Sequence, residues 1–206
     1  MRTMSQRVAI VTDSTASIPV DVAEQLDIHV VQLELKIGDE YNDERRVPQP
    51  KLAEAMRENV GVATSEPPPP AFFWTYSDAA ASGAEAIVSV HISEEISKTC
   101  ESARAAAADL NVPVYVVDSR LAGLGVGYPV MAAAEAAKSG ASVQGVLSVL
   151  DQRLRSTTQL VYVDTMEFLH RNGRISRTQA KLGQTFSIKP VLIFRDGRIE
   201  QHTKSI

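Results

Sequence analysis

The sequence has little cysteine, few aromatic residues and no concentration of positive charge. Its single cysteine, Cys100, excludes an internal disulfide and a thiolate metal cage, and it fits a reducing compartment, so we expect a cytoplasmic protein. Aromatic residues make up 5% of the chain, so the core must consist mainly of Val, Ile, Leu and Ala. The net charge is −4 and Lys and Arg form no cluster, which speaks against a nucleic-acid partner.

Long apolar runs are also missing. No stretch approaches the roughly 20 apolar residues that a membrane-spanning helix needs. The N-terminal apolar run covers only residues 8–11 and ends at Asp13, which is too short for a signal peptide. We therefore expect no membrane span and leave open a transient contact with a membrane surface.

Strands and helices alternate up to about residue 155. Short apolar runs rich in Val and Ile occupy residues 8–11, 86–90 and 114–117, and each is followed by a helix-forming segment. Continuous apolar runs are typical of parallel strands that are covered on both faces. The predicted fold class is therefore α/β, with a parallel-sheet N-terminal domain over residues 1–156 and helices on both faces.

Turn-forming residues set the prediction for three further segments. Residues 28–37 are predicted to form one long strand. Residues 61–70 include four consecutive prolines and form the most loop-like stretch, because proline fits neither a helix interior nor a central strand. Asp196 and Gly197 lie between two apolar segments and predict a β-hairpin.

Polar side chains follow the three predicted parallel strands. Ser14 follows the first strand, Ser93 the second and Ser119 the third. Ligands of open α/β sheets bind beyond the carboxyl ends of the strands, so this pattern predicts a binding site rich in Ser, Thr and Asp. Such a site would also suit a phosphoryl- or acyl-transfer enzyme. The chain lacks a glycine-rich phosphate loop and a G-x-S-x-G nucleophile turn, which disfavours that alternative.

Seven short segments, in order along nearly the whole chain, resemble the DegV family. They are AIVTDSTASIP at 9–19, YND at 41–43, TSEP at 64–67, HISEEISKT at 91–99, VDS at 117–119, RNGRIS at 171–176 and IKPV at 188–191. Each segment is short, and their shared order makes the resemblance specific.

The resemblance implies a bacterial two-domain protein that holds a long-chain fatty acid, such as palmitate, between its domains. The second domain, residues 157–206, would be of the α+β type, and it would be incomplete because members of the family run longer. The family's binding proteins carry no nucleotide site of their own. We therefore expect a lipid-binding protein without catalytic residues, metal or cofactor.

The resemblance also implies roles for individual residues. In the family a Thr and a Ser hold the carboxylate, and by position these are Thr64 and Ser97. Ser93 and Ser14 are further candidates for lining the ligand site, with helix capping and turn formation as the alternatives. Some bacterial members present the acid to a separate fatty acid kinase, and Arg174 is expected to face this partner.

Three residues near Ser97 depart from the family's pattern. Glu94 and Glu95 replace a Ser and a Gly, and Lys98 replaces a second Gly. These changes would alter the head-group geometry more than the fold. His91 ends a predicted strand and has no Asp or Ser pairing nearby in sequence that would mark a catalytic triad. We therefore interpret it as a buried or capping histidine.

Overall fold

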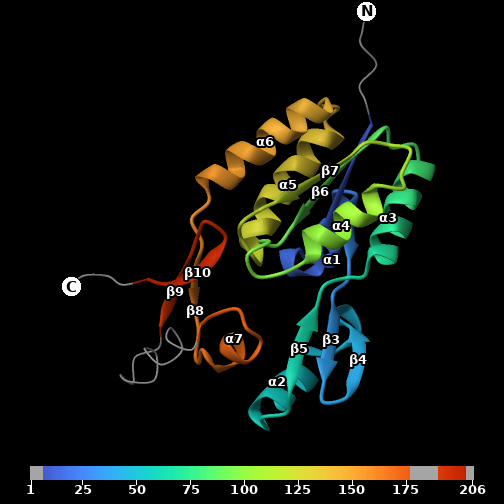
Figure 1. The fold of residues 1–206 in the computed structure, drawn as a ribbon. Coiled ribbons are helices and arrows are strands. Elements are labelled where there is room, and N and C mark those ends of the chain that lie inside the picture. Colours follow the sequence, from blue (N-terminus) through green and yellow to red (C-terminus); the bar gives the residue numbers. More distant parts are fainter. Residues whose placement is uncertain (1–6, 177–189, 203–206) are drawn as a thin grey trace, which may run out of the picture.

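A computed structural model of the protein describes residues 7–176 and 190–202, and its centre is a parallel sheet of four strands (Figure 1). The strands are β1 (Val8–Asp13), β2 (Ile28–Val31), β6 (Ala86–His91) and β7 (Val114–Asp118). They lie in the order β2-β1-β6-β7, and each neighbouring pair runs parallel. The predicted α/β class with a parallel sheet is therefore confirmed.

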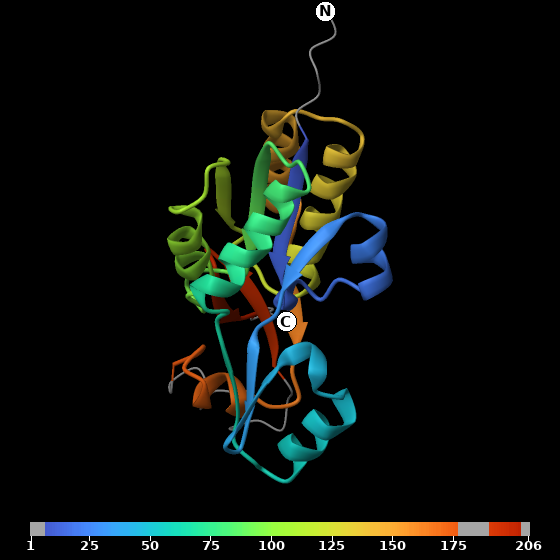
Figure 2. The same cartoon turned by 90° about the vertical axis from the view of Figure 1, so that its right-hand side faces the viewer.

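Helices cover both faces of this sheet (Figures 1 and 2). They are α1 (Val20–Gln25), α3 (Pro69–Ala81), α4 (Thr99–Ala107), α5 (Leu124–Lys138) and α6 (Val143–Ser156). Successive residues of a strand point to opposite faces. In β1, Ile10 packs in a core shared with α5 and α6, whereas Val11 packs in a core shared with α3 and α4.

The predicted long strand at residues 28–37 is wrong, because the chain leaves the parallel sheet at Gln32 and Leu33. The Leu33 amide donates to Ser14 Oγ at 3.0 Å, and the Leu33 carbonyl accepts from the Glu44 amide at 3.0 Å. These bonds satisfy the backbone outside any strand ladder, so the strand can break here. Two separate strands result, β2 and β3 (Glu34–Ile37).

The strand β3 belongs to a small antiparallel sheet in the order β4-β3-β5. The other strands of this sheet are β4 (Glu40–Asp43) and β5 (Val62–Ser65). Two helices connect them, η2 (Glu44–Arg46) and then α2 (Gln49–Arg57). The strand β5 lies inside the stretch predicted as a loop, so that prediction is wrong for residues 62–65. The prolines follow β5, and Pro69 and Pro70 begin α3, where a missing N–H is tolerated.

A third sheet, also antiparallel, lies at the C-terminal side in the order β10-β9-β8. Its strands are β8 (Leu160–Tyr162), β9 (Val191–Arg195) and β10 (Arg198–Gln201), and α7 (Glu167–Arg171) follows β8. Asp196 and Gly197 turn the chain between β9 and β10 with φ of 47° and 82°, which confirms the predicted hairpin. Residues 188–189, the first two of the IKPV segment, lie outside the described residues.

The parallel strands point their carboxyl ends toward the two small sheets (Figures 1 and 2). The sheet with β3 and β5 lies beyond β1 and β2, and the sheet with β8 and β9 lies beside it. The two small sheets therefore lie next to the edge of the parallel sheet at which the sequence predicts a ligand site. In the part of the chain that the structure describes, no helix is long and apolar enough to cross a membrane.

Candidate functional site

A cavity of about 440 Å³ lies beyond the carboxyl ends of the parallel strands. Its wall combines β5, the segment that follows β6, α7 with its flanking loop, and the C-terminal sheet. Most of the lining is apolar, including Leu33, Met56, Val62, Ala63, Ile92, Ile96, Val161, Phe168, Leu169, Leu192, Phe194 and Ile199. An apolar cavity with few polar groups is the usual form of a small-molecule site.

Thr64 and Ser97, the residues expected to hold a carboxylate, both line this cavity. Thr64 lies on β5 opposite Leu35, and its hydroxyl has no hydrogen-bond partner within the described residues. Ser97 lies in the turn before α4, with its Oγ 2.8 Å from Thr99 Oγ1. The structure therefore places two hydroxyl-bearing residues from separate elements in the lining of one mainly apolar cavity.

Ser93 and Ser14 do not belong to the lining of this cavity. Ser93 is fully buried, and its Oγ donates to the Gly197 carbonyl at 2.7 Å, which ties the segment after β6 to the β9–β10 hairpin. Ser14 Oγ donates to a carboxylate oxygen of Glu44 and accepts the Leu33 amide. In this structure both serines anchor backbone segments.

Arg174 also lines the cavity and is half-buried. Its Nη1 donates to the Asn172 carbonyl at 2.6 Å. Asn172 Nδ2 in turn donates to the Val62 carbonyl at 3.2 Å and to the Phe168 carbonyl at 2.9 Å. Asn172 therefore fixes the loop after α7 against β5, and this loop carries the guanidinium of Arg174 at the cavity wall.

The acidic residues that depart from the family's pattern are engaged in ion pairs. Glu94 pairs with Arg104 on α4, and Glu95 pairs with Arg198 at 2.7 Å. Each carboxylate therefore has an adjacent cation, which offsets the negative charge that these two residues bring near Ser97.

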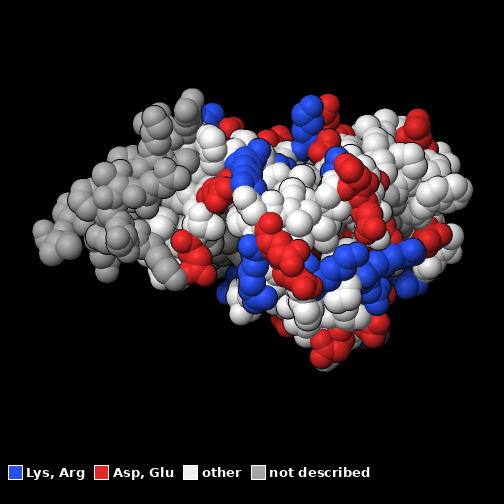
Figure 3. Space-filling view, turned by 90° about the horizontal axis from the view of Figure 1, so that it is seen from below, with Lys and Arg blue, Asp and Glu red and all other residues white. Residues whose placement is uncertain are grey.

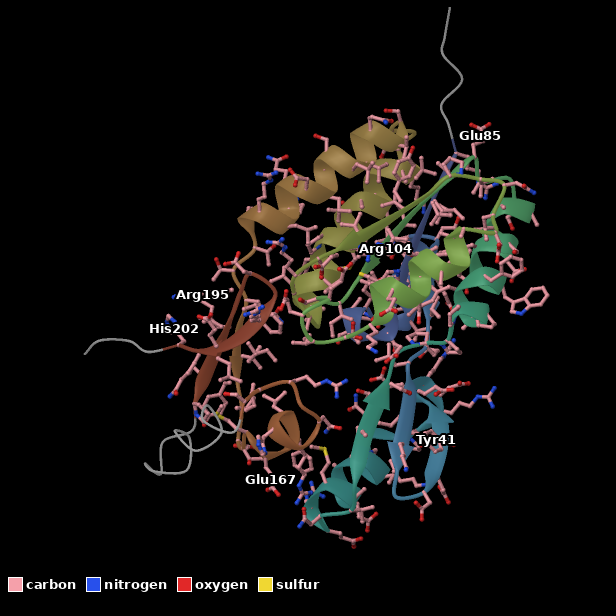
Figure 4. All side chains as sticks on the ribbon, in the orientation of Figure 1. Tyr41, Glu85, Arg104, Glu167, Arg195 and His202 are labelled. Atoms are coloured by element: carbon pink, nitrogen blue, oxygen red, sulfur yellow. The ribbon has the colours of Figure 1, made fainter. Side chains whose placement is uncertain are left out.

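Charges of both signs alternate on the face of the molecule formed by α2, α7 and the β3 sheet (Figure 3). Tyr41 on β4 and Glu167 on α7 lie toward this side (Figure 4). Glu167 pairs with Arg171, and Glu40 pairs with Lys51 at 3.2 Å.

Within the described residues, no group of three or more His, Cys, Asp or Glu side chains could hold a metal ion.

A buried chain of polar side chains lies behind the cavity wall. Asp13 Oδ2 is 2.8 Å from His91 Nδ1, His91 Nε2 is 2.7 Å from Ser89 Oγ, and Ser89 Oγ is 2.8 Å from Tyr76 Oη. All four side chains are buried, which confirms the interpretation of His91 as a buried histidine. Asp13 Oδ1 also accepts the amide and the hydroxyl of Thr15, which lines the cavity.

The direction of these hydrogen bonds determines which ring nitrogen of His91 carries the proton. Burial raises the pKa of the Tyr76 hydroxyl, so Tyr76 keeps its proton. This hydroxyl is fully buried and Ser89 is its only partner within the described residues, so Tyr76 donates to Ser89. Ser89 then donates to His91 Nε2, which leaves the imidazole proton on Nδ1 as the donor to Asp13. His91 and Ser89 have no exposed surface, and neither side chain lines the cavity.

Gln159 is a cavity residue that no sequence pattern predicts. Its side-chain Oε1 accepts the Ala122 amide at 3.0 Å, and its Nε2 donates to the Ala122 carbonyl at 2.7 Å. Both residues line the cavity, so this double hydrogen bond joins the loop before α5 to the segment before β8. The local sequence, in which Gln159 follows two threonines and precedes a leucine, contains no motif that predicts such a role.

The family model and the curated relatives that match this chain belong to the same family. A family described as "Uncharacterised protein, DegV family" matches residues 7–206. A DegV domain-containing protein of Streptomyces coelicolor is 40% identical over 198 residues, which cover 96% of this chain and 70% of the relative.

Two solved structures resemble the whole described fold. One is from a Thermus thermophilus DegV family protein and is described as showing fatty acid binding. It is 35% identical, with a TM-score of 0.87, and covers 96% of this chain and 71% of that one. The other is Bacillus subtilis DegV, described as a fatty acid binding protein, at 32% identity and a TM-score of 0.84 over 98% of this chain and 73% of that one.

Proposed function

The chain belongs to the DegV family, and from this membership we propose that it binds a long-chain fatty acid such as palmitate. The acyl tail would occupy the 440 Å³ cavity, and the hydroxyls of Thr64 and Ser97 would hold the carboxylate. The observation that carries the proposal is that Thr64 and Ser97 both line one cavity whose lining is otherwise mainly apolar.

The two parts of the ligand would contribute differently. Burying about 15 methylenes at roughly 0.8 kcal/mol each gives an upper limit of about 12 kcal/mol before the entropy of binding is subtracted. Hydroxyl groups donate charge-assisted hydrogen bonds to a carboxylate and fix its direction. The tail would therefore supply most of the affinity, and Thr64 and Ser97 would set the orientation of the head group.

We further propose that the bound acid is presented to a separate fatty acid kinase, with Arg174 facing that partner. Two neutral hydroxyls can hold a carboxylate and still leave one of its oxygens open to a phosphoryl donor. A guanidinium at the cavity wall suits the approach of such an anionic donor. The protein would then act as a carrier in the cytoplasm, and the partner would supply the chemistry.

Lipid analysis and titration test the main proposal. The purified protein is extracted with organic solvent for mass spectrometry, and the stripped protein is titrated with palmitate. We expect a co-purified acyl chain, and a loss of roughly 10- to 100-fold in affinity for Thr64→Val or Ser97→Ala, because a hydrogen bond to a charged group is worth about 1.5–3 kcal/mol.

Two exposed positions provide matched controls. Thr158→Val and Ser82→Ala remove the same groups at exposed positions outside the cavity lining and should leave the affinity unchanged. The proposal fails if no acyl chain co-purifies and the stripped protein does not bind added palmitate. The head-group assignment fails if the two cavity variants bind as tightly as the controls.

A further inference from the structure

The hydroxyls of Ser97 and Thr99 form a pair whose direction can be assigned. Ser97 Oγ lies 2.8 Å from Thr99 Oγ1 and also accepts the Thr99 amide at 3.3 Å. Thr99 is the first residue of α4 and is fully buried, whereas Ser97 is half-buried and lines the cavity. The pair therefore joins a buried hydroxyl to one that a ligand can reach.

The burial of Thr99 decides which hydroxyl donates. A buried O–H group that makes no hydrogen bond costs about 1–3 kcal/mol, so Thr99 must donate its proton. Within the described residues, Ser97 Oγ is the only partner of the Thr99 hydroxyl. Thr99 therefore donates to Ser97, and the Ser97 oxygen accepts both the hydroxyl and the amide of Thr99. The hydroxyl proton of Ser97 therefore points away from Thr99, and the cavity that Ser97 lines offers space for an acceptor.

We propose that Thr99 is a positioning residue that makes Ser97 a hydrogen-bond donor toward the cavity and thereby selects a carboxylate head group. This inference rests on the proposed function, in which Ser97 contacts the head group of a fatty acid. A carboxylate only accepts hydrogen bonds, and it does so more strongly than an alcohol. A fixed donor would therefore favour a fatty acid over the fatty alcohol of the same length.

The backbone of Ser97 is held by other bonds. The Ser97 amide donates to the Ser93 carbonyl at 3.1 Å, and the Ser93 amide donates to the Leu121 carbonyl at 3.0 Å. Ser93 Oγ is anchored to Gly197. Removing the Thr99 hydroxyl should therefore change where the Ser97 proton points while the position of Ser97 is retained.

A double-mutant cycle with two ligands tests this inference. Thr99→Val is made in the native chain and in Ser97→Ala, and each protein is titrated with palmitate and with hexadecanol. We expect Thr99→Val to weaken palmitate binding by about 3- to 10-fold, as for one neutral hydrogen bond, with little change for hexadecanol. Thr99→Ser should restore palmitate binding, and Thr99→Val should have no further effect in Ser97→Ala.

Three results would overturn the inference. They are an unchanged palmitate affinity in Thr99→Val, an equal loss for acid and alcohol, and the same loss in the Ser97→Ala background. If Thr99→Val does not fold, as judged by thermal unfolding, Thr99→Ala gives the same comparison. A native protein that binds no palmitate would instead refute the proposed function itself, which separates the two failures.

Discussion

Nδ1 of His91 lies 2.8 Å from a carboxylate oxygen of Asp13, and neither side chain is exposed to solvent. The same carboxylate accepts the amide of Thr15 at 3.0 Å and the amide of Ile92 at 3.4 Å. Thr15 and Ile92 both line the cavity. One buried carboxylate therefore joins the ends of β1 and β6 at the edge of the sheet on which the cavity wall is built.

Replacing His91 by Leu should destabilise the protein by about 3 kcal/mol. The change removes a donor from a buried carboxylate, and breaking a buried pair on one side leaves the other group uncompensated. Urea unfolding followed by circular dichroism measures the change. His29 on the edge strand β2 is half-buried and makes no side-chain hydrogen bond within the described residues, so His29→Leu is the control. Equal stabilities of the two variants would contradict the role given to the Asp13–His91 pair.

Gly197→Ala should destabilise the protein more than Gly173→Ala. Both glycines have positive φ, 82° and 74°, so both alanine variants strain the backbone by about 1 kcal/mol. A Cβ at Gly197 would also lie 2.5 Å from Ser93 Oγ, whereas a Cβ at Gly173 would meet nothing within 4 Å. The difference between their free energies of unfolding therefore measures the collision with Ser93.

The Gly197 prediction also concerns the cavity. Ser93 holds the segment that carries Ser97, so its displacement by Gly197→Ala should weaken palmitate binding, while Gly173→Ala should leave the Ser93 contact intact. If the two variants lose equal stability, the Ser93–Gly197 contact does not fix the hairpin against the segment after β6.

The parallel sheet could be predicted from the sequence because its strands are buried on both faces and are therefore continuous apolar runs. The strand β5 could not, because it has only four residues, is partly exposed and lies between Gly61 and the prolines, so its composition is that of a loop. The break between β2 and β3 involves the hydrogen bonds of the Leu33 amide to Ser14 and of the Leu33 carbonyl to the Glu44 amide, and neither residue is a sequence neighbour of Leu33.

The candidate site is less predictable from the sequence than the fold is. Thr64 and Ser97 are predicted only through the resemblance of their segments to the DegV family, and both residues line one cavity in the structure. His91 is hydrogen-bonded to Asp13 on β1 and to Ser89 on its own strand β6, and Ser89 is hydrogen-bonded in turn to Tyr76 on α3. The local sequence around His91 does not reveal Asp13 or Tyr76, because both lie on other elements. Gln159 acts through the backbone of Ala122, and contacts of a side chain with a distant backbone leave no pattern in the sequence.

Ala63→Phe should shift the ligand preference toward shorter fatty acids. Ala63 lies on β5 and lines the cavity, so a larger side chain there would occupy space that the acyl tail needs. Each methylene kept out of the cavity costs about 0.8 kcal/mol, so excluding three should weaken palmitate binding by about 2 kcal/mol. Competition between palmitate and dodecanoate measures the shift. Ala81→Phe, at an exposed position of α3, should leave the preference unchanged, and a similar response of both variants would mean that the tail lies elsewhere.

Stability should fall as the pH rises above about 9, because two buried groups resist ionisation. Burial raises the pKa of the Cys100 thiol above its ordinary value of 9.0, with further contributions from the charges of Glu94 and Asp118. Burial likewise raises the pKa of Tyr76 above its ordinary value of 10.0. In the unfolded chain both groups lose their protons at these ordinary values, so above them the unfolded state is favoured as the pH rises. Below pH 9 both states keep these protons, and neither group contributes a slope.

Urea unfolding at a series of pH values measures this effect. Each group should remove up to about 1.4 kcal/mol of stability per pH unit above its ordinary pKa. Cys100→Ala should remove the part that begins near pH 9, and Tyr76→Phe the part that begins near pH 10, even though each variant starts from a lower stability. The comparison therefore rests on the slope of stability against pH and not on its absolute value. A slope in Cys100→Ala that equals that of the native protein between pH 9 and 10 would show that the thiol ionises as readily in the folded chain as in the unfolded one.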